Sequence, residues 1–484
     1  MSFIVVTDDP EDLPIDDAEI VSVSDYLALD VYRQAKNLRV FNFCASYSYQ
    51  SQGYYVSLLA TAREHKIIPP LANILDLKSP TYLKVRSASL DDLIQKNLKD
   101  IKSSSFELSI YFGRNLAKKY DRLCQELYSS FRAPLLRAKF IKTDTWHLSS
   151  IRPIGIKEVS ANHREDFLEI ARTFFHKRIH RCEIKSPKFS LAILIDPDEK
   201  LPPSNEKAIQ LFQKAARKLR IDSELITKAD IGRLSEFDGL FIRVTTAVNH
   251  YTYRFAQKAS ALGLVVIDDP ESILRCTNKV YLEELFLKHE LPTPPSTIVH
   301  KTNYESRIEG MKLPAVLKVP DSAFSLGVTK VQTPEELQKN VKRILEHSDL
   351  MIVQEFLPTS FDWRVGILAG KIIYVCKYFM ANDHWQIYKQ PQGTDEKIQD
   401  GDAETLSLEE VPAKLKKMAL KAAKAVGDGL YGIDIKQLGE RFLMIEINDN
   451  PSIDAGVEDS IAGDKLYESI MQEFLDRRQK TYAE

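Results

Sequence analysis

The chain has 484 residues, 44% of them hydrophobic and 28% charged, with a formal net charge of −2 at pH 7. This composition is ordinary for a globular protein, and the length predicts about three domains. The near-neutral charge argues against nucleic acid or a membrane surface as the main partner. No apolar run approaches the roughly 20 residues of a membrane helix. No signal-like N-terminus and no CxxC pair occur, so we expect a cytoplasmic protein.

The first 150 residues predict a separate α/β domain. Apolar spacing indicates strands and helices in turn: a strand over 3–6, a helix over 55–62, a strand over 106–112 and a helix over 116–131. A hydroxyl-rich turn at 46–51 precedes the first of these helices. Such a turn is a candidate anion site, but serines also favour helix caps, and we favour the capping interpretation.

Residues 151–187 are predicted to be a connector with a helix around 165–178. His176 and His180 have the i, i+4 spacing of a metal pair, and Cys182 is nearby. Their neighbours are cationic and no carboxylate lies within the cluster. We therefore favour a solvated basic face over a metal site here.

From residue 188 to 275 strands and helices alternate, which is typical of a parallel sheet with crossover helices. The first strand, over 189–195, is almost continuously apolar, as expected for a sheet covered on both faces. No glycine-rich fingerprint follows it, which argues against a dinucleotide cofactor. Arg243 lies at the carboxyl end of the strand predicted over 237–244, where open α/β sheets bind ligands, and is a candidate for binding a substrate carboxylate.

One lysine interrupts an apolar strand later in the chain. Lys318 ends the run Leu313-Pro-Ala-Val-Leu-Lys. A buried ammonium without a partner is costly, so this lysine needs an anion. The polyphosphate of ATP would serve.

A predicted hairpin near the C-terminus carries oxygen ligands. Its strands run over 431–436 and 442–451 around a turn at Gly439. Because side chains alternate along a strand, Met444, Glu446 and Asn448 are expected on one face and Ile445 and Ile447 on the other. Together with Asp434 on the neighbouring strand, Glu446 and Asn448 would form a cluster of oxygen ligands that suits Mg²⁺. The plain alternative is an edge hairpin with a solvated polar face.

The sequence Gly432-Ile-Asp434, followed by Glu446-Ile-Asn448 and Pro451, resembles the metal-binding end of ATP-grasp ligases of the RimK-like, glutathione-synthetase-like branch. Residues 42–59 and 108–113 are similar to an N-terminal extension found before some RimK-like proteins. The resemblance implies an α/β fold class with four parts: an N-terminal α/β extension domain over 1–150, a connector over 151–187, a parallel-sheet pre-ATP-grasp domain over 188–275 and a two-lobed α+β ATP-grasp domain over 276–484.

The resemblance also implies a nucleotide site. Lys279 and Lys318 would face ATP, Asp362 would lie near the ribose, and Arg364 would face the transferring phosphate, acting with Lys318 in catalysis. The segment Gln354, Glu355, Phe356 and Leu357 would form the adenine hinge. The metal, Mg²⁺ with Mn²⁺ as an alternative, would bind Asp434, Glu446 and Asn448.

The implied activity is that of an ATP-dependent carboxylate–amine ligase, acting on an amino acid, a small peptide or a peptide terminus through an acyl phosphate and releasing ADP and phosphate. Candidate substrate-binding residues are Arg243, Lys377, Lys389 and Asp454, and a homo-oligomer is left open. The chain departs from the family in a glycine-poor flap over 321–328 and in its acceptor loop over 382–393. These departures support an alternative: a non-catalytic nucleotide-binding regulator whose N-terminal domain binds a partner.

Overall fold

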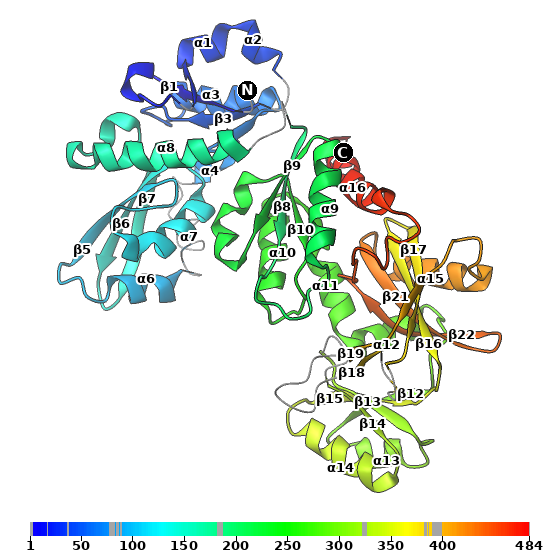
Figure 1. Cartoon of the computed structure of the whole chain (residues 1–484). Helices are drawn as coiled ribbons and strands as arrows, with labels where there is room; N and C mark the ends of the chain where they lie inside the picture. The colour runs from blue at the N-terminus through cyan, green and yellow to red at the C-terminus, as the bar shows by residue number, and fades with distance from the viewer. Residues whose placement is uncertain are drawn as a thin grey trace. The chain divides into compact units, whose positions relative to one another are not determined.

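The computed structural model describes residues 3–16, 18–35, 38–76, 83, 87, 90–181, 187–321, 327–381, 385, 387–389 and 399–483 (Figure 1). The chain divides into two compact units. The first comprises 1–190 with 220–222 and 229–236, and the second comprises the remainder. The four domain ranges stay a prediction. No helix among the described residues is long and apolar enough to cross a membrane.

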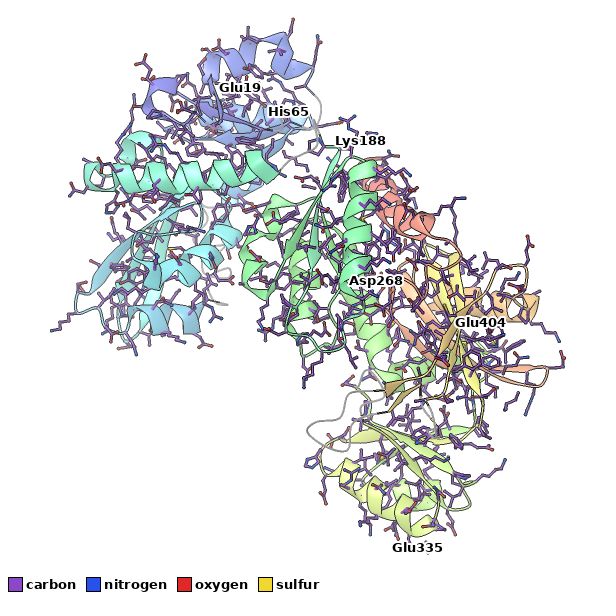
Figure 2. All side chains as sticks on the ribbon, viewed as in Figure 1. Glu19, His65, Lys188, Asp268, Glu335 and Glu404 are labelled. Atoms are coloured by element: carbon purple, nitrogen blue, oxygen red, sulfur yellow. The ribbon has the colours of Figure 1, made fainter. Side chains whose placement is uncertain are left out.

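The first unit begins with a parallel sheet in the order β2-β1-β3-β4. Its elements are β1 (Phe3–Thr7), η1 (Pro10–Asp12), β2 (Glu19–Ser22), α1 (Val23–Ala28), α2 (Asp30–Arg33), β3 (Arg39–Asn42), α3 (Gln52–Ala62), β4 (Lys66–Ile68) and α4 (Leu71–Asp76). Ser51 caps α3 by accepting from Tyr54 N, which agrees with the capping interpretation of the serine-rich turn. The Tyr26 hydroxyl and the ring of His65 form a buried hydrogen bond of 3.0 Å in this core. Figure 2 labels His65.

An antiparallel sheet in the order β5-β6-β7 follows in the same unit. Its elements are α6 (Asp91–Leu98), β5 (Ser105–Tyr111), η2 (Lys118–Tyr120), α7 (Asp121–Phe131), β6 (Leu135–Lys142), β7 (Trp146–Pro153), η3 (Ile156–Glu158), η4 (Ala161–His163) and α8 (Arg164–Arg181). Helix α8 packs into the core of this unit, where the Phe175 and Phe3 rings stack at 5.3 Å. Cys182 and the side chains of His176 and His180 lie outside the described residues.

A second parallel arrangement, in the order β11-β10-β8-β9, confirms the strand–helix alternation predicted after residue 188. Its elements are β8 (Phe189–Leu194), α9 (Glu206–Lys218), β9 (Ile221–Ile226), η5 (Lys228–Glu236), β10 (Gly239–Ile242), α10 (Tyr251–Ala261), β11 (Val265–Ile267) and α11 (Pro270–Thr277). Asn205 caps α9 by accepting from Ala208 N at 2.9 Å. The C-terminal helix α16 (Asp464–Ala483) packs on α9, with the Phe212 and Tyr467 rings 4.8 Å apart.

Two antiparallel sheets complete the second unit, in the orders β12-β15-β13-β14 and β20-β17-β16-β21-β22. The elements of the first are α12 (Lys279–Lys288), β12 (Ser296–His300), α13 (Tyr304–Ile308), β13 (Ala315–Lys318), β14 (Val328–Val331), α14 (Pro334–Leu345) and β15 (Leu350–Glu355). Those of the second are β16 (Phe361–Leu368), β17 (Lys371–Phe379), β20 (Ala403–Thr405), α15 (Ala413–Val426), β21 (Leu430–Leu438) and β22 (Arg441–Asn448). A short pair, β18 (Tyr388–Lys389) and β19 (Gln399–Asp400), lies between β17 and β20 in sequence.

The predicted hairpin is β21–β22, but one expectation about its faces is wrong. Asp434 pairs with Glu446 and Ile435 pairs with Met444, so Ile445 is an extra residue in β22. Such a bulge resets the alternation of side chains. Met444 is therefore buried in the core with Ile447, whereas Ile445 lines a cavity together with Glu446 and Asn448.

Candidate functional site

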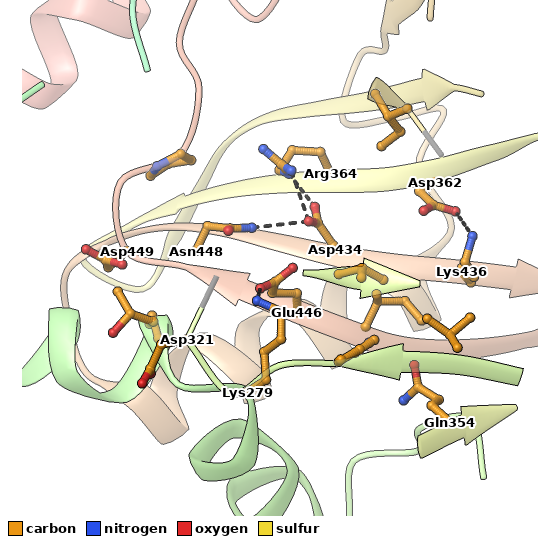
Figure 3. A pocket seen from close by; sticks show the side chains of 18 of the residues that line it. Lys279, Asp321, Gln354, Asp362, Arg364, Asp434, Lys436, Glu446, Asn448 and Asp449 are labelled. Carbon is orange, nitrogen blue, oxygen red and sulfur yellow. Dashed lines mark hydrogen bonds and ion pairs between the residues drawn. The ribbon is translucent and has the colours of Figure 1, made fainter. Parts of the chain in front are cut away.

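The second unit contains a cavity of about 330 Å³, part of which is drawn in Figure 3. Every residue that the sequence predicts for catalysis, nucleotide binding or metal binding lines it. These residues are Lys279, Lys318, Gln354, Glu355, Phe356, Leu357, Asp362, Arg364, Asp434, Glu446 and Asn448. The structure thus brings together residues that lie up to 169 positions apart, since 448 − 279 = 169. Their individual roles stay predictions.

A row of charged side chains crosses three neighbouring strands. Asp434 on β21 is paired in register with Arg364 on β16 and with Glu446 on β22. Paired residues share one face of a sheet, with Cβ atoms about 5 Å apart. The Arg364 guanidinium donates to both Asp434 oxygens, at 2.9 Å for the bond to Oδ2. The register of the sheet therefore fixes the geometry of this row.

Gly432 leaves space for the side chains of the charged row. It pairs with Asn448 across the hairpin and with Gly366 on β16. A Cβ at position 432 would lie 2.7 Å from Pro451 Cβ and 3.0 Å from Arg364 Cδ. Only glycine lets the Arg364 side chain lie across the strand to reach Asp434.

Lysines meet the row from the opposite side of the cavity. Lys279, the first residue of α12, donates to Glu446 at 2.9 Å and is 7% exposed. Burial lowers the pKa of Lys318 from 10.5 to about 8, although the charge of Glu446 raises it. Burial would raise the pKa of Glu446, but the Lys279 and Lys318 charges outweigh it and the pKa is lowered. Glu446 is therefore ionised over the whole neutral range.

Lys436 is a cavity residue that the sequence analysis did not assign. It donates to Asp362 at 2.6 Å and to Thr359 at 2.7 Å. The sequence did contain a pattern that predicts this position: Lys436 lies two residues after Asp434 on one strand, so the two side chains share a face. With it, another carboxylate–cation pair, Asp362 and Lys436, lies beside the charged row in the cavity lining.

The predicted adenine hinge has part of its backbone already bonded. Glu355 N donates to the Pro295 carbonyl at 2.8 Å and Phe356 N to the Pro314 carbonyl at 3.0 Å. Among the hinge N–H groups, that of Leu357 is left for an adenine edge. The Phe356 ring lies 5.8 Å from the ring of Trp385, edge to face, and provides an apolar surface beside the hinge.

The loop after β22 forms another part of the cavity lining. Asp449 is 4% exposed. Burial raises the pKa of its carboxyl to about 7, and a hydrogen bond with the Thr246 side chain opposes that rise.

Arg243 lies behind this lining and does not contact the cavity. Its buried guanidinium donates to Ser204, to Asn450 Oδ1 at 2.6 Å and to the Pro451 carbonyl at 2.9 Å. All of these partners belong to the protein. The structure therefore supports a positioning role for Arg243, and its direct contact with a substrate carboxylate stays a prediction.

The other substrate candidates are placed differently. Lys377 pairs in register with Trp363, so it points to the face of the sheet opposite Arg364, where it forms an ion pair with Glu404 at 3.2 Å. This geometry places Lys377 on the other face from Arg364, and its role in substrate binding stays a prediction. Asp454 accepts from Asn205 N at 2.6 Å. The side chain of Lys389 and most of the flap and acceptor loop lie outside the described residues.

The donor set fits a hard divalent cation. Two carboxylates paired across the hairpin, Asp434 and Glu446, lie beside the Asn448 amide, whose Nδ2 donates to Asp434 at 3.1 Å. The described residues contain no group of three His, Cys, Asp or Glu arranged for a metal. Mg²⁺ commonly takes only one or two carboxylates and fills its other positions with waters and phosphate oxygens. These three residues match that requirement.

Comparison with known proteins gives two family matches. Residues 23–170 match the RimK-like ATPgrasp N-terminal domain, and residues 285–455 match the D-ala D-ala ligase C-terminus. A probable alpha-L-glutamate ligase of Parasynechococcus marenigrum is 22% identical over 243 residues, which are 48% of each chain. One of Haemophilus influenzae is 22% identical over 46% of this chain and 70% of its own. The first match thus spans about half the length of that relative.

A solved structure is also similar. The RimK domain protein ATP-grasp from Sphaerobacter thermophilus superposes with a TM-score of 0.45 at 15% identity, covering 58% of this chain and 98% of that one.

Proposed function

We propose that this chain, which belongs to the ATP-grasp ligases and carries the N-terminal domain of their RimK-like branch, uses ATP to join a carboxylate to an amine. The substrates are an amino acid or a small peptide, or the terminus of a peptide. The products are the amide, ADP and phosphate. The glutamate ligases named among its relatives support an amino acid as one partner.

The observation that carries this proposal is the row Arg364–Asp434–Glu446, aligned by strand register and met by Lys279 in one cavity. An enzyme that transfers a phosphoryl group needs positioned cations and metal ligands more than it needs a nucleophile of its own. The cavity supplies both kinds of group at a single place.

Each residue has a distinct task in this proposal. Asp434, Glu446 and Asn448 hold Mg²⁺, which when bound neutralises phosphate charge. Lys279 and Lys318 turn from Glu446 toward the polyphosphate, and Arg364 stabilises charge on the phosphate that is transferred. Phe356 and Leu357 hold the adenine. These groups act by orientation and charge, so the chain needs no covalent intermediate of its own.

The test is ATP turnover in the presence of amino acids. Purified protein is incubated with ATP, Mg²⁺ and pools of amino acids and dipeptides, and ADP, phosphate and product mass are measured. The proposal predicts ADP release that depends on both substrates. It also predicts a product whose mass is the sum of the donor and acceptor masses minus that of one water. No ADP release with any pool, from protein that binds ATP, would instead support the non-catalytic regulator considered as the alternative.

A further inference from the structure

Two buried oxygen atoms beside the cavity lack hydrogen-bond partners. Among the described residues, Asp449 Oδ2 and Thr245 Oγ1 are buried and make no hydrogen bond. Both residues line the cavity, together with Thr246 and Asn450. We call these four residues the Asp449 wall; Figure 3 labels Asp449 beside Asn448.

An unpaired carboxylate oxygen in a buried place is costly, and proteins seldom keep one without a reason. Three other carboxylates of the cavity are paired with cations: Asp434 with Arg364, Glu446 with Lys279 and Asp362 with Lys436. Among the described residues, Asp449 has the Thr246 side chain and its own backbone N–H as hydrogen-bonding neighbours, and its Oδ2 bonds to neither. The contrast indicates that a ligand group completes Asp449.

Hydrogen bonds to neighbouring segments fix the Asp449 wall in position. Arg243 donates to Asn450 Oδ1 at 2.6 Å, and Asn450 Nδ2 donates to the Val244 carbonyl at 2.7 Å. Thr245 N donates to Glu199 at 3.1 Å. These bonds fix the loops after β10 and β22 against each other, so both unpaired oxygens are held in the lining of one cavity.

We propose that Asp449 and Thr245 bind the α-ammonium group of the amino acid whose carboxylate is activated. An ammonium has three donors and no acceptor, which complements an acceptor-only carboxylate and a hydroxyl oxygen. This inference rests on the proposed function, because it assumes that the cavity activates a carboxylate.

The position of Asp449 in the chain favours the α-ammonium over a more distant amine. Asp449 directly follows Asn448, one of the proposed metal ligands, and consecutive Cα atoms lie about 3.8 Å apart. In an α-amino acid the ammonium is on the carbon next to the carboxylate, so both groups can be held by neighbouring residues. The attacking amine must be neutral, whereas a carboxylate stabilises the ammonium form, so Asp449 suits the donor amino acid and not the acceptor.

The test measures binding and not turnover. Thermal unfolding of the full chain is followed with Mg²⁺ and a non-hydrolysable ATP analogue, adding the common L-amino acids or D-alanine one at a time. Each amino acid that raises the midpoint is compared with the same acid lacking its amino group. We expect the des-amino acid to bind about ten- to a hundredfold more weakly, as for loss of a hydrogen bond to a charged group.

The variants are Asp449→Asn and Thr245→Val, with Thr245→Ser as the control that keeps the hydroxyl. Asp449→Asn should abolish the preference for the amino acid over its des-amino counterpart while the analogue still stabilises the protein. Thr245→Val should reduce that preference, and Thr245→Ser should keep it. If Asp449→Asn does not fold, Thr245→Val decides.

The inference is overturned if no amino acid stabilises the wild-type protein, if the des-amino acid binds equally well, or if the variants keep the wild-type preference. Weakened Mg²⁺ binding in Asp449→Asn with an unchanged preference would also overturn it and make Asp449 a metal-supporting residue. Failure of the proposed function looks different, because the wild-type protein would then release no ADP with any substrate.

Discussion

The two parts of the cavity lining differ in how their charges are satisfied. Around β16, β21 and β22 each carboxylate of the charged row has a cation within hydrogen-bond distance. At the Asp449 wall a buried carboxylate oxygen and a buried hydroxyl have no partner among the described residues. The first part is stable without a ligand, whereas the second is stabilised only when a ligand supplies a donor.

This difference separates two kinds of specificity. In the charged row a nucleotide and a cation would exchange partners with ion pairs already present, so binding replaces one set of charges by another. At the Asp449 wall, a ligand would add hydrogen bonds to oxygen atoms that have none. A molecule without the matching donor would leave these oxygens unpaired and would therefore bind weakly. Variants of the charged row test this difference, because the carboxylates of the row already have cations as partners.

Glu446→Gln should lower turnover by about a hundred- to a thousandfold, as for loss of one essential charged group in a preorganised site. The amide keeps the shape of the side chain but neither pairs with Lys279 as an anion nor binds Mg²⁺ well. Steady-state ADP release measures the effect. Glu440→Gln, at an exposed glutamate in the same hairpin, is the matched control and should keep wild-type turnover. Equal turnover in the two variants would contradict the metal assignment.

Arg364→Met should lower the free energy of unfolding by about 3–5 kcal/mol, because it leaves the buried Asp434 without its cation. The side chains of this pair are only 12% and 14% exposed, so solvent screens the pair weakly. Denaturant unfolding measures the change, and Arg441→Met on the exposed end of β22 serves as control. A loss below about 1 kcal/mol, the range of a surface ion pair, would show that Asp434 does not depend on Arg364.

Gly432→Ala should reduce stability by about 1–3 kcal/mol through overpacking and should also lower kcat by displacing Arg364. The new Cβ would meet Pro451 Cβ at 2.7 Å and Arg364 Cδ at 3.0 Å. Gly439→Ala is the control: it strains a turn with a φ of +58° but meets no neighbour within 4 Å. Only the change at position 432 should affect kcat, and an effect of equal size in both variants would refute the role given to Gly432.

The affinity for ATP should fall as the pH rises above about 8. Burial lowers the pKa of Lys318 to about 8, so the ammonium that attracts phosphate is present well below that pH, is half lost at the pKa and is lost progressively above it. ATP binding measured by calorimetry between pH 7 and pH 9 tests this expectation. Lys318→Arg keeps its charge over that range and should flatten the profile. A profile that is equally steep in the variant would assign the pH dependence to another group.

Local patterns predicted much of the site and failed where long-range pairing decides. Alternation and order along the chain identified Asp434, Glu446 and Asn448, which do line one cavity. The same alternation misplaced Met444, because a bulge depends on how two strands pair and not on one strand alone. Lys377 was named as a candidate for substrate binding, but the face on which its side chain lies depends on the register between β16 and β17. The register between strands depends on tertiary packing, so it cannot be predicted from the local pattern of a single sequence.

The partners of buried polar groups were equally hard to foresee. Arg243 was expected at a ligand-binding edge, and it does follow a strand of the parallel sheet, yet its partners are Ser204, Asn450 and Pro451 from distant segments. No periodicity links those segments. The missing partner of Asp449 is likewise visible only once the surrounding loops are in place.

A crystal structure of the full chain with Mg²⁺ and a non-hydrolysable ATP analogue tests the central claim most directly. The account predicts a metal about 2.1 Å from oxygen atoms of Glu446 and its neighbouring ligands, with Lys279 and Lys318 turned to the phosphates. A nucleotide bound elsewhere, or bound here with Lys279 still paired to Glu446 and no metal between them, would contradict it.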